Sequence, residues 1–423
     1  MRKMKDSGVA WIGEMPEDWT VKRGKFTLKL LNRPVKETDD VITCFRDGEV
    51  TLRTNRRTDG FTVSVKEIGY QGIEPGDLVI HGMDGFAGSI GISDSRGKSS
   101  PVLVVCDTDE NKRYIMYYLR SMAYNDVFTA LATGIRVRSC DLRWNKLAEL
   151  PYILPSLEEQ NQIVLAIESS TSKVDALIAN VQAQIEKLKA YKQSLITEVV
   201  IKGLDPTVPM KDSGVEWIGK MPAAWDISRV GLHYTVILGK MLCPKQLDDS
   251  YTLEKYYCAA NVHFGEVNSD DLKEMWFSPA EKEQYHVNVG DMLIVEGGAG
   301  AGGCAVVQQT TNALVQNSVM IVRNLRGTDN RYLRYWIESL VGRGYIDVIC
   351  NKATIPHFTK EKLSKTVFPV SSQDEQVQIS DYLDEKCAQI DRVTAIKQAK
   401  IEKLEQYKRS LIYEYVTGKK EVS

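Results

Sequence analysis

One helical sequence occurs twice in this chain of 423 residues, and the repeat constrains the fold more than any other feature. Residues 185–200 and 401–416 are identical at 11 of 16 positions, and neither segment contains Gly or Pro. Most of their residues favour helix. A lone amphipathic helix of this length is only marginally stable in water, because its stability comes from burying the apolar stripe. Two copies in one chain can bury each other's stripe.

Heptad spacing extends through both copies and into the residues before them. In the first copy the apolar positions are Val174, Ile178, Val181, Ile185, Leu188, Leu195 and Val199, with Lys192 between them. In the second copy the positions are Ile390, Thr394, Lys397, Ile401, Leu404, Lys408, Leu411 and Tyr415. This seam predicts an intramolecular coiled coil with a few polar interruptions. Two ordinary core helices, each under its own domain, are the alternative interpretation.

A second repeat precedes each half of the chain. Residues 4–23 and 210–229 match at 13 of 20 positions, and a period of about 210 residues indicates domain duplication rather than a solenoid. Tryptophans carry large buried area, so we expect those of each copy to dock onto a helix end. Specifically, we expect 4–23 to pack near 411–416, and 210–229 to pack near 195–200. Ser156 with Glu159, and Ser372 with Glu375, predict capping boxes at the starts of the long helices.

The segments between these repeats share only an outline. Apolar runs at 78–80, 102–105, 292–294 and 319–322 predict buried strands, as does alternation at Val63 and Val65. Gly-rich stretches at 81–91 and 296–303 predict tight turns or close backbone packing, and helices should begin near Arg113 and Arg331. The expected fold is α+β. It has two mixed α/β inserts separated by two long antiparallel helices that form an intramolecular coiled coil, in a pseudo-two-fold arrangement.

The domain boundaries follow from this plan. The expected segments are 1–155 (N-terminal segment and first insert), 156–205 (first long helix), 206–370 (connector and second insert) and 371–423 (second long helix).

Composition narrows the class of protein. No run approaches the roughly 18–20 apolar residues of a membrane span, and the basic start lacks the apolar stretch of a signal peptide. Eight cysteines are spread singly without a Cys-x-x-Cys pair, which favours reduced thiols in a cytoplasmic protein with no membrane partner. The net charge of −2 does not indicate a polyanion ligand, although basic residues clustered on one face would still allow nucleic-acid binding.

Motifs for catalysis are missing from the sequence. Neither Gly-rich stretch ends in Gly-Lys-Ser/Thr, and no Asn-Pro-Pro-Tyr/Phe or Asp-Pro-Pro-Tyr string of an amino-methyltransferase occurs. The five histidines have no metal-ligand spacing. The sequence therefore predicts a non-enzymatic binding protein without cofactor or metal.

Four motifs carry a family resemblance, in the same order in both halves. They are Met-Lys-Asp-Ser-Gly-Val-x-Trp-Ile-Gly, the Gly-Asp-Leu-Val-Ile type of strand, the Pro-containing link ending in Glu-Gln, and the Ile-Glu-Lys-Leu-x-x-Tyr-Lys-x-Ser-Leu-Ile helix. Together they resemble the specificity subunit of type I restriction–modification enzymes. The resemblance implies two target-recognition domains, each of which reads one half of a bipartite, asymmetric site in double-stranded DNA. It also implies helices that set the spacer and bind two modification (methyltransferase) subunits, with restriction (translocase/nuclease) subunits joining them.

Basic and amide side chains of both inserts are candidates for DNA contact, because Arg can read guanine in the major groove and Arg or Lys can neutralise phosphate. The candidates are Arg46, Arg53, Asn55, Arg56, Arg57, Arg136, Arg138 and Arg143 in the first insert, and Lys240, Lys245, Asn351, Lys352 and His357 in the second. Two other functions remain open. One is a coiled-coil adaptor without DNA specificity, and the other is the recognition subunit of a methylation-only system.

Overall fold

The computed structural model describes residues 2–56, 67–130, 142–325, 327–350 and 356–422. The chain divides into two compact units, Met1–Gln182 with Gln398–Ser423, and Ala183–Lys397. We call these unit 1 and unit 2. Two long helices contribute to both units: α4 (Leu157–Lys202) and α10 (Gln373–Val416). In the described residues, no helix is both long and apolar enough to cross a membrane.

The centre of unit 1 is a four-stranded antiparallel sheet whose two faces are both covered. Its strands, in spatial order, are β4 (Lys29–Leu30), β11 (Leu103–Asp107), β8 (Leu78–His81) and β9 (Ile90–Ile92). Because successive side chains of a strand point to opposite faces, Leu78 and Ile80 pack with helix α1 (Lys112–Tyr124) while Val79 packs with a separate cluster around Ile42. Helix α1 lies against β9 of this sheet.

Short elements complete unit 1. Its paired strands are β1 (Met4–Asp6) with β2 (Glu14–Pro16), β3 (Thr20–Arg23) with β12 (Pro151–Leu154), β5 (Ile42–Cys44) with β6 (Val50–Leu52), and β7 (Gln71–Ile73) with β10 (Gly97–Ser99). Its short helices are η1 (Gly24–Phe26), η2 (Arg53–Asn55), η3 (Gly85–Ala87), α2 (Val127–Ala130) and α3 (Trp144–Leu147).

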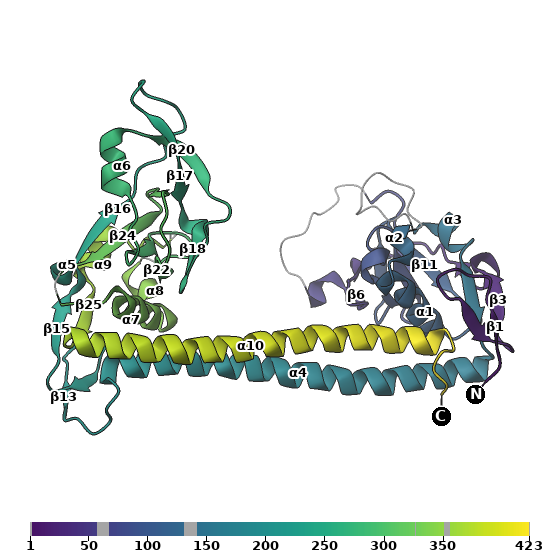
Figure 1. The fold of residues 1–423 in the computed structure, drawn as a ribbon. Coiled ribbons are helices and arrows are strands. Elements are labelled where there is room, and N and C mark those ends of the chain that lie inside the picture. The colour runs from purple at the N-terminus through teal and green to yellow at the C-terminus, as the bar shows by residue number, and fades with distance from the viewer. Residues whose placement is uncertain (1, 57–66, 131–141, 326, 351–355, 423) are drawn as a thin grey trace. The chain divides into compact units, whose positions relative to one another are not determined.

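Unit 2 contains the same central sheet, but the elements that surround this sheet are different. The strands β16 (Tyr234–Leu238), β24 (Val319–Asn324), β21 (Met292–Val295) and β22 (Cys304–Val306) repeat the order of the first sheet, with α7 (Asn330–Gly342) in the place of α1. A second sheet is added, made of β20 (Lys273–Phe277), β17 (Thr252–Tyr257) and β23 (Leu314–Val315), together with α6 (Pro279–Tyr285) (Figure 1). The two inserts therefore share a core and differ in what is built on it.

Two further strand pairs of unit 2 repeat β1–β2 and β3–β12 of unit 1, and the other elements are short. Strand β13 (Met210–Asp212) pairs with β14 (Lys220–Pro222), β15 (Asp226–Arg229) with β25 (Val367–Val370), and β18 (Val262–His263) with β19 (Glu266–Val267). The short helices are α5 (Val230–His233), η4 (Ala259–Asn261), α8 (Tyr345–Ile349) and α9 (Lys360–Lys365).

Within each unit, a segment of α4 lies along a segment of α10, and the predicted seam is buried between them. Seam residues such as Val174, Val181, Ile401 and Leu411 are at most 5% exposed. Lys408 Nζ bonds to both carboxylate oxygens of Asp175 at 2.7 Å in unit 1, and Lys192 Nζ bonds to those of Asp391 in unit 2. The residue numbers of both pairs add up to the same value, as required for antiparallel helices in one register. The predicted α+β fold with an intramolecular coiled coil is confirmed.

The strands predicted at 78–80, 102–105, 292–294 and 319–322 are present as β8, β11, β21 and β24. The helices expected near Arg113 and Arg331 are α1 and α7. The predicted strand around Val63 and Val65 lies outside the described residues. The Gly-rich stretches provide close packing, since a Cβ at Gly91 would lie 1.9 Å from the carbonyl oxygen of Gly48.

Candidate DNA-contact surfaces on a duplicated frame

The start of each long helix holds a tryptophan of the repeated N-terminal motif. The Ser156 hydroxyl accepts from the Glu159 amide at 3.3 Å, as a helix cap should, while the Glu159 carboxylate accepts from the Trp19 indole at 3.0 Å. Unit 2 repeats this arrangement with Ser372, Glu375 and Trp225, whose indole donates at 2.9 Å. The cap hydroxyl of the predicted capping boxes is thus present, but each glutamate carboxylate receives a tryptophan N–H.

The glutamine after each of these glutamates joins the helix to its insert. Gln160 is fully buried; its Oε1 accepts from the Asn111 amide at 2.9 Å and its Nε2 donates to the Pro155 carbonyl at 3.1 Å. In unit 2, Gln376 accepts from the Asp329 amide at 3.1 Å and donates to the Ser371 carbonyl at 3.0 Å. Both glutamines therefore satisfy backbone groups that would otherwise be buried without partners.

A buried tyrosine ties three elements together in each unit. The Tyr114 hydroxyl of α1 lies 2.9 Å from the Ile153 carbonyl of β12 and 3.1 Å from the Val416 carbonyl at the end of α10. Tyr332 of α7 lies 3.0 Å from the Pro369 carbonyl of β25 and 2.9 Å from the Val200 carbonyl of α4. Burial raises the pKa of both hydroxyls well above the usual value, so both stay protonated.

The N-terminal segments pack where the repeat predicted. Val9, Ile12 and Trp19 share a core cluster with Leu411 and Val416. Ile218, Met221 and Trp225 share a cluster with Ile196 and Val200 in unit 2. The prediction that each segment docks on the end of a long helix is confirmed.

These paired contacts define a frame that occurs once in each unit. It consists of the N-terminal motif, the strand pair β3–β12 or β15–β25, the short link before the long helix, and the long-helix segments. Each insert is attached to one copy of this frame.

In the first insert, the candidates Arg46, Arg53 and Arg56 lie in or just after the β5–β6 hairpin. The Phe45 amide donates to the Glu49 carbonyl and Gly48 has a φ of +90°, which is a three-residue hairpin loop closed by a left-handed glycine. Arg56 Nη1 lies 2.7 Å from Asp47 Oδ2 and 2.9 Å from Glu49 Oε2. The Arg56 guanidinium lies over the Phe45 ring, 4.1 Å from its centroid.

The hairpin loop is held against helix α1. Arg120 Nη2 of α1 donates to the Asp47 carbonyl at 2.7 Å, and a Cβ at Gly48 would lie 2.3 Å from the Arg120 guanidinium. Burial tends to raise the pKa of the Asp47 carboxyl, but hydrogen bonds from the Glu49 amide and Arg56 outweigh it and lower the pKa. Asp47 therefore stays ionised beside Arg56 at neutral pH.

The other described candidates of this insert have different surroundings. Arg46 pairs with Asp84 at 3.0 Å and keeps 69% of its side chain exposed. Arg53 Nε lies 3.5 Å from the Thr43 hydroxyl, and Asn55 donates to the Thr51 hydroxyl at 2.8 Å. Arg143 is exposed at the start of α3.

The second insert places its candidates far apart in sequence and in different surroundings. Lys240 is buried, with its ammonium paired to Glu281 and within 5.4 Å of the Tyr251 and Phe277 ring centroids. Lys245 and His357 are exposed. His357 pairs with Gly297 of the Gly-rich stretch, where an added Cβ would lie 2.7 Å from the imidazole. The candidates Arg57, Arg136, Arg138, Asn351 and Lys352 lie outside the described residues.

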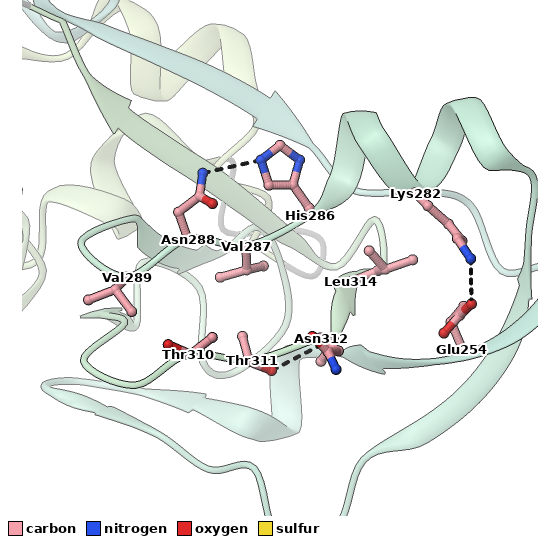
Figure 2. Close-up of a pocket in the computed structure, with 11 residues that line it drawn as sticks. Glu254, Lys282, His286, Val287, Asn288, Val289, Thr310, Thr311, Asn312 and Leu314 are labelled. Atoms are coloured by element: carbon pink, nitrogen blue, oxygen red, sulfur yellow. Dashed lines mark hydrogen bonds and ion pairs between the residues drawn. The ribbon is translucent and has the colours of Figure 1, made fainter.

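A cleft of about 590 Å³ opens on the second insert between β17, the end of α6 and the loop before β23 (Figure 2). Lys282 and Glu254 form an ion pair of 2.9 Å at one end, and Asn288 lies 3.2 Å from the His286 ring at the other. Buried Val287 and Leu314 line its apolar part. This mixed lining is typical of a surface groove rather than an enclosed ligand pocket.

Among the described residues, no group of three His, Cys, Asp or Glu could hold a metal ion. The seven cysteines in the described part of the chain are free thiols.

Sequence reasoning selected Arg46 and Arg56 but missed Phe45, Asp47, Glu49 and Arg120, which hold the hairpin. An Asp-Gly dipeptide between two apolar alternating runs is the signal that could have found the hairpin. The partners of Arg56 could not be found that way, because they depend on how the loop folds back.

The sequence of this chain is similar to those of known DNA specificity proteins. Residues 265–406 match the family model described as the type I restriction modification DNA specificity domain. A putative type I restriction enzyme MjaX specificity subunit of Methanocaldococcus jannaschii is 23% identical, covering 96% of this chain and 95% of that protein. The MjaVIII specificity subunit of the same organism is 22% identical, covering 96% and 93%.

Solved structures show the same fold. A chain from a study of complex assembly and conformational transition in a type I R–M system aligns with a TM-score of 0.72 at 16% identity, covering 96% of this chain and 99% of that one. The HsdS subunit of Thermoanaerobacter tengcongensis aligns with a TM-score of 0.51 at 16% identity, covering 96% and 98%.

The described residues define an internally duplicated protein in which two unlike inserts are each attached to one copy of the frame. Over nearly its whole length the chain is similar to specificity subunits of type I restriction–modification systems, and it shares the fold of one of them.

Proposed function

We propose that this chain selects the DNA site of a type I restriction–modification complex, with each insert reading one half of a bipartite, asymmetric sequence. The observation that carries the proposal is the contrast between frame and inserts. Frame contacts recur almost bond for bond, as with Trp19–Glu159 and Trp225–Glu375. The insert surfaces differ, since in the part of the chain that the structure describes only the second insert carries a three-stranded sheet, β20–β17–β23. Two unlike surfaces suit two different half-sites.

We propose segments 1–155 and 206–370 as the two target-recognition domains, and 156–205 and 371–423 as the helices that set the spacer. All thirteen candidate residues are proposed to approach DNA, with the exposed ones in direct contact. Buried Lys240 is proposed to act by holding α6 in place. The chain has no proposed chemistry of its own; modification and cleavage would belong to its partner subunits.

The long helices are proposed to bind two methyltransferase subunits through equivalent patches. Four exposed apolar residues each directly precede a seam position, and so flank the seam on one side. They are Leu177 (51% exposed) and Tyr407 (54%) in unit 1, and Tyr191 (58%) and Val393 (42%) in unit 2. The register of the Lys–Asp pairs brings Leu177 level with Tyr407 and Tyr191 level with Val393. Repeated patches favour two copies of one partner.

Mapping of methylated bases tests the central proposal. The chain is co-expressed with its methyltransferase partner, and genomic DNA is sequenced for modified bases. We expect one asymmetric motif of two short half-sites separated by unread bases. Methylation without a motif would favour a coiled-coil adaptor, and a methylated motif with no cleavage by the complete complex would favour a methylation-only system.

An insertion tests the spacer. Four residues added within 178–188 add about one turn, or roughly 6 Å, to the helix. We expect a longer preferred spacer between unchanged half-sites, read by the same methylation mapping. A change in the half-site sequences themselves would contradict the proposal.

Stoichiometry tests the docking patches. Tyr191→Glu with Val393→Glu should reduce the number of bound methyltransferase subunits from two to one, measured by native mass spectrometry. Leu165→Glu is the matched control, because Leu165 is 67% exposed on the same helix but is not beside the seam. Two bound copies in the double variant would exclude this patch.

A further inference from the structure

Arg56 differs from the other described candidates because its guanidinium is held on three sides. Phe45 lies beneath it at 4.1 Å from ring centroid to Cζ, and Asp47 and Glu49 both bond to Nη1. These three residues belong to one tight hairpin loop. Arg120 fixes that loop from α1 through the Asp47 carbonyl at 2.7 Å. The Arg56 side chain is therefore oriented before any DNA is bound.

The atoms that the carboxylates engage decide which edge is left for a ligand. Both carboxylates contact Nη1, so they do not use the side edge formed by Nε–H and Nη2–H. That edge presents two parallel donors, the pattern that fits O6 and N7 of guanine in the major groove. Because Arg is planar, fixing Nη1 and stacking the plane also fixes the direction of the other edge.

The local charge argues against a phosphate as the ligand. Two carboxylates already pair with the Arg56 guanidinium, so a phosphate there would face two like charges at close range. A unit charge at 4 Å in water changes affinity by roughly fivefold. Guanine is neutral and avoids this repulsion. Arg46 offers the contrast, since it has one carboxylate partner and 69% of its side chain exposed.

We propose that Arg56 reads a guanine in the half-site of the first insert, and that Phe45, Asp47 and Glu49 are the positioning residues that make this contact specific. This inference rests on the proposed function and names one of its base-reading residues.

The test uses the full chain in complex with its methyltransferase subunits, and duplexes with single base-pair changes throughout the methylated motif. Arg56→Ala should reduce discrimination at one G·C pair of one half-site by about 5- to 150-fold. Arg56→Lys keeps the charge but not the paired donors, and should show the same loss. Asp47→Asn with Glu49→Gln, or Phe45→Leu, should relax the same base pair to a smaller extent.

Two comparisons make the result decisive. Asp47→Asn with Glu49→Gln should have no added effect on discrimination in the Arg56→Ala background, because the carboxylates are proposed to act through Arg56. Arg46→Ala should instead weaken binding to all duplexes alike and lower the salt dependence by about one unit of slope.

The inference is overturned if Arg56→Ala weakens binding to all duplexes equally. It is also overturned if Arg56→Lys keeps full discrimination while the stability of unit 1 is unchanged. Either result is compatible with the proposed function, provided that the chain without substitutions still directs methylation to a motif. If the chain without substitutions directed methylation to no sequence motif, that result would instead contradict the proposed function.

Discussion

The frame and the inserts of this protein follow different rules. In the frame, equivalent residues of the two units make equivalent bonds, and each such residue satisfies groups from two or three elements, as Tyr114 and Tyr332 do. Among the described residues of the inserts, the four-stranded sheet and the helix that follows it recur, whereas the β5–β6 hairpin of the first insert and the β20–β17–β23 sheet of the second differ. A residue that holds several elements together cannot change alone, whereas a residue on an insert surface can.

The largest expected effect tests whether the two copies of the frame are energetically equal. Trp19→Ala and Trp225→Ala should each destabilise their own unit by about 3–5 kcal/mol, because a buried ring and its bond to a helix-cap glutamate are lost. Hydrogen exchange, resolved by unit, measures the change. Phe26→Ala, at a side chain that is 73% exposed, is the control with little effect. Strongly unequal effects would break the equivalence.

A smaller loss of stability is expected from the buried tyrosine that connects a long helix, a strand and an insert helix in each unit. Tyr114→Phe and Tyr332→Phe remove one hydroxyl between two buried carbonyls, and each should cost about 1–3 kcal/mol. Denaturant unfolding of each variant measures the cost. The exposed pair Tyr191→Phe and Tyr407→Phe should be nearly neutral. If Tyr332→Phe alone had no effect on stability, the hydroxyl of Tyr332 would contribute less to unit 2 than that of Tyr114 does to unit 1.

Substitution of a residue in an insert should change the stability of its own unit only. Arg96 holds the Asp39 carboxyl through Nε and Nη2, at 2.8 and 2.7 Å, and lowers its pKa from 3.8 to about 2. A depressed carboxyl pKa adds stability above pH 3.8 that is lost as pH falls through about 2. Asp39→Asn should therefore destabilise unit 1 by about 1–2 kcal/mol at neutral pH and flatten its acid transition.

Acid unfolding followed by hydrogen exchange separates this effect from a general one. Unit 2 should unfold as before, and the exposed neighbour Asp40→Asn should leave both units unchanged. An equal loss in unit 2 would mean that the inserts are coupled more tightly than their separate cores imply.

The smallest effect is expected from moving the chain ends. Six residues, 204–209, join Gly203 to the second N-terminal motif, and eight would join Gly418 to the first if Ser423 were fused to Met1. The Arg2 amide already lies 3.0 Å from a Glu421 carboxylate oxygen. A circular permutant opened near residue 207 should fold with nearly unchanged stability in denaturant unfolding. Aggregation of this directly fused permutant would show that the two connections are not interchangeable.

The sequence by itself determined the frame. Repeated heptads predicted which faces of the long helices pair, and the tryptophan motifs predicted where the chain packs against the helix ends, because the period of apolar residues is a local property of the sequence. Even the polar interruptions at Lys192 and Lys408 were visible. Their partners, Asp391 and Asp175, were not, since the register of antiparallel helices is set by contacts far apart in the sequence.

The tertiary structure alone decided the character of the insert surfaces. Arg56 and Lys240 look alike in sequence as basic candidates. Folding stacks the first on Phe45 between two carboxylates of an anchored hairpin loop, and encloses the second between aromatic rings with Glu281. The physical reason is that burial and charge environment depend on which distant segments meet at a residue, and no local period encodes that meeting.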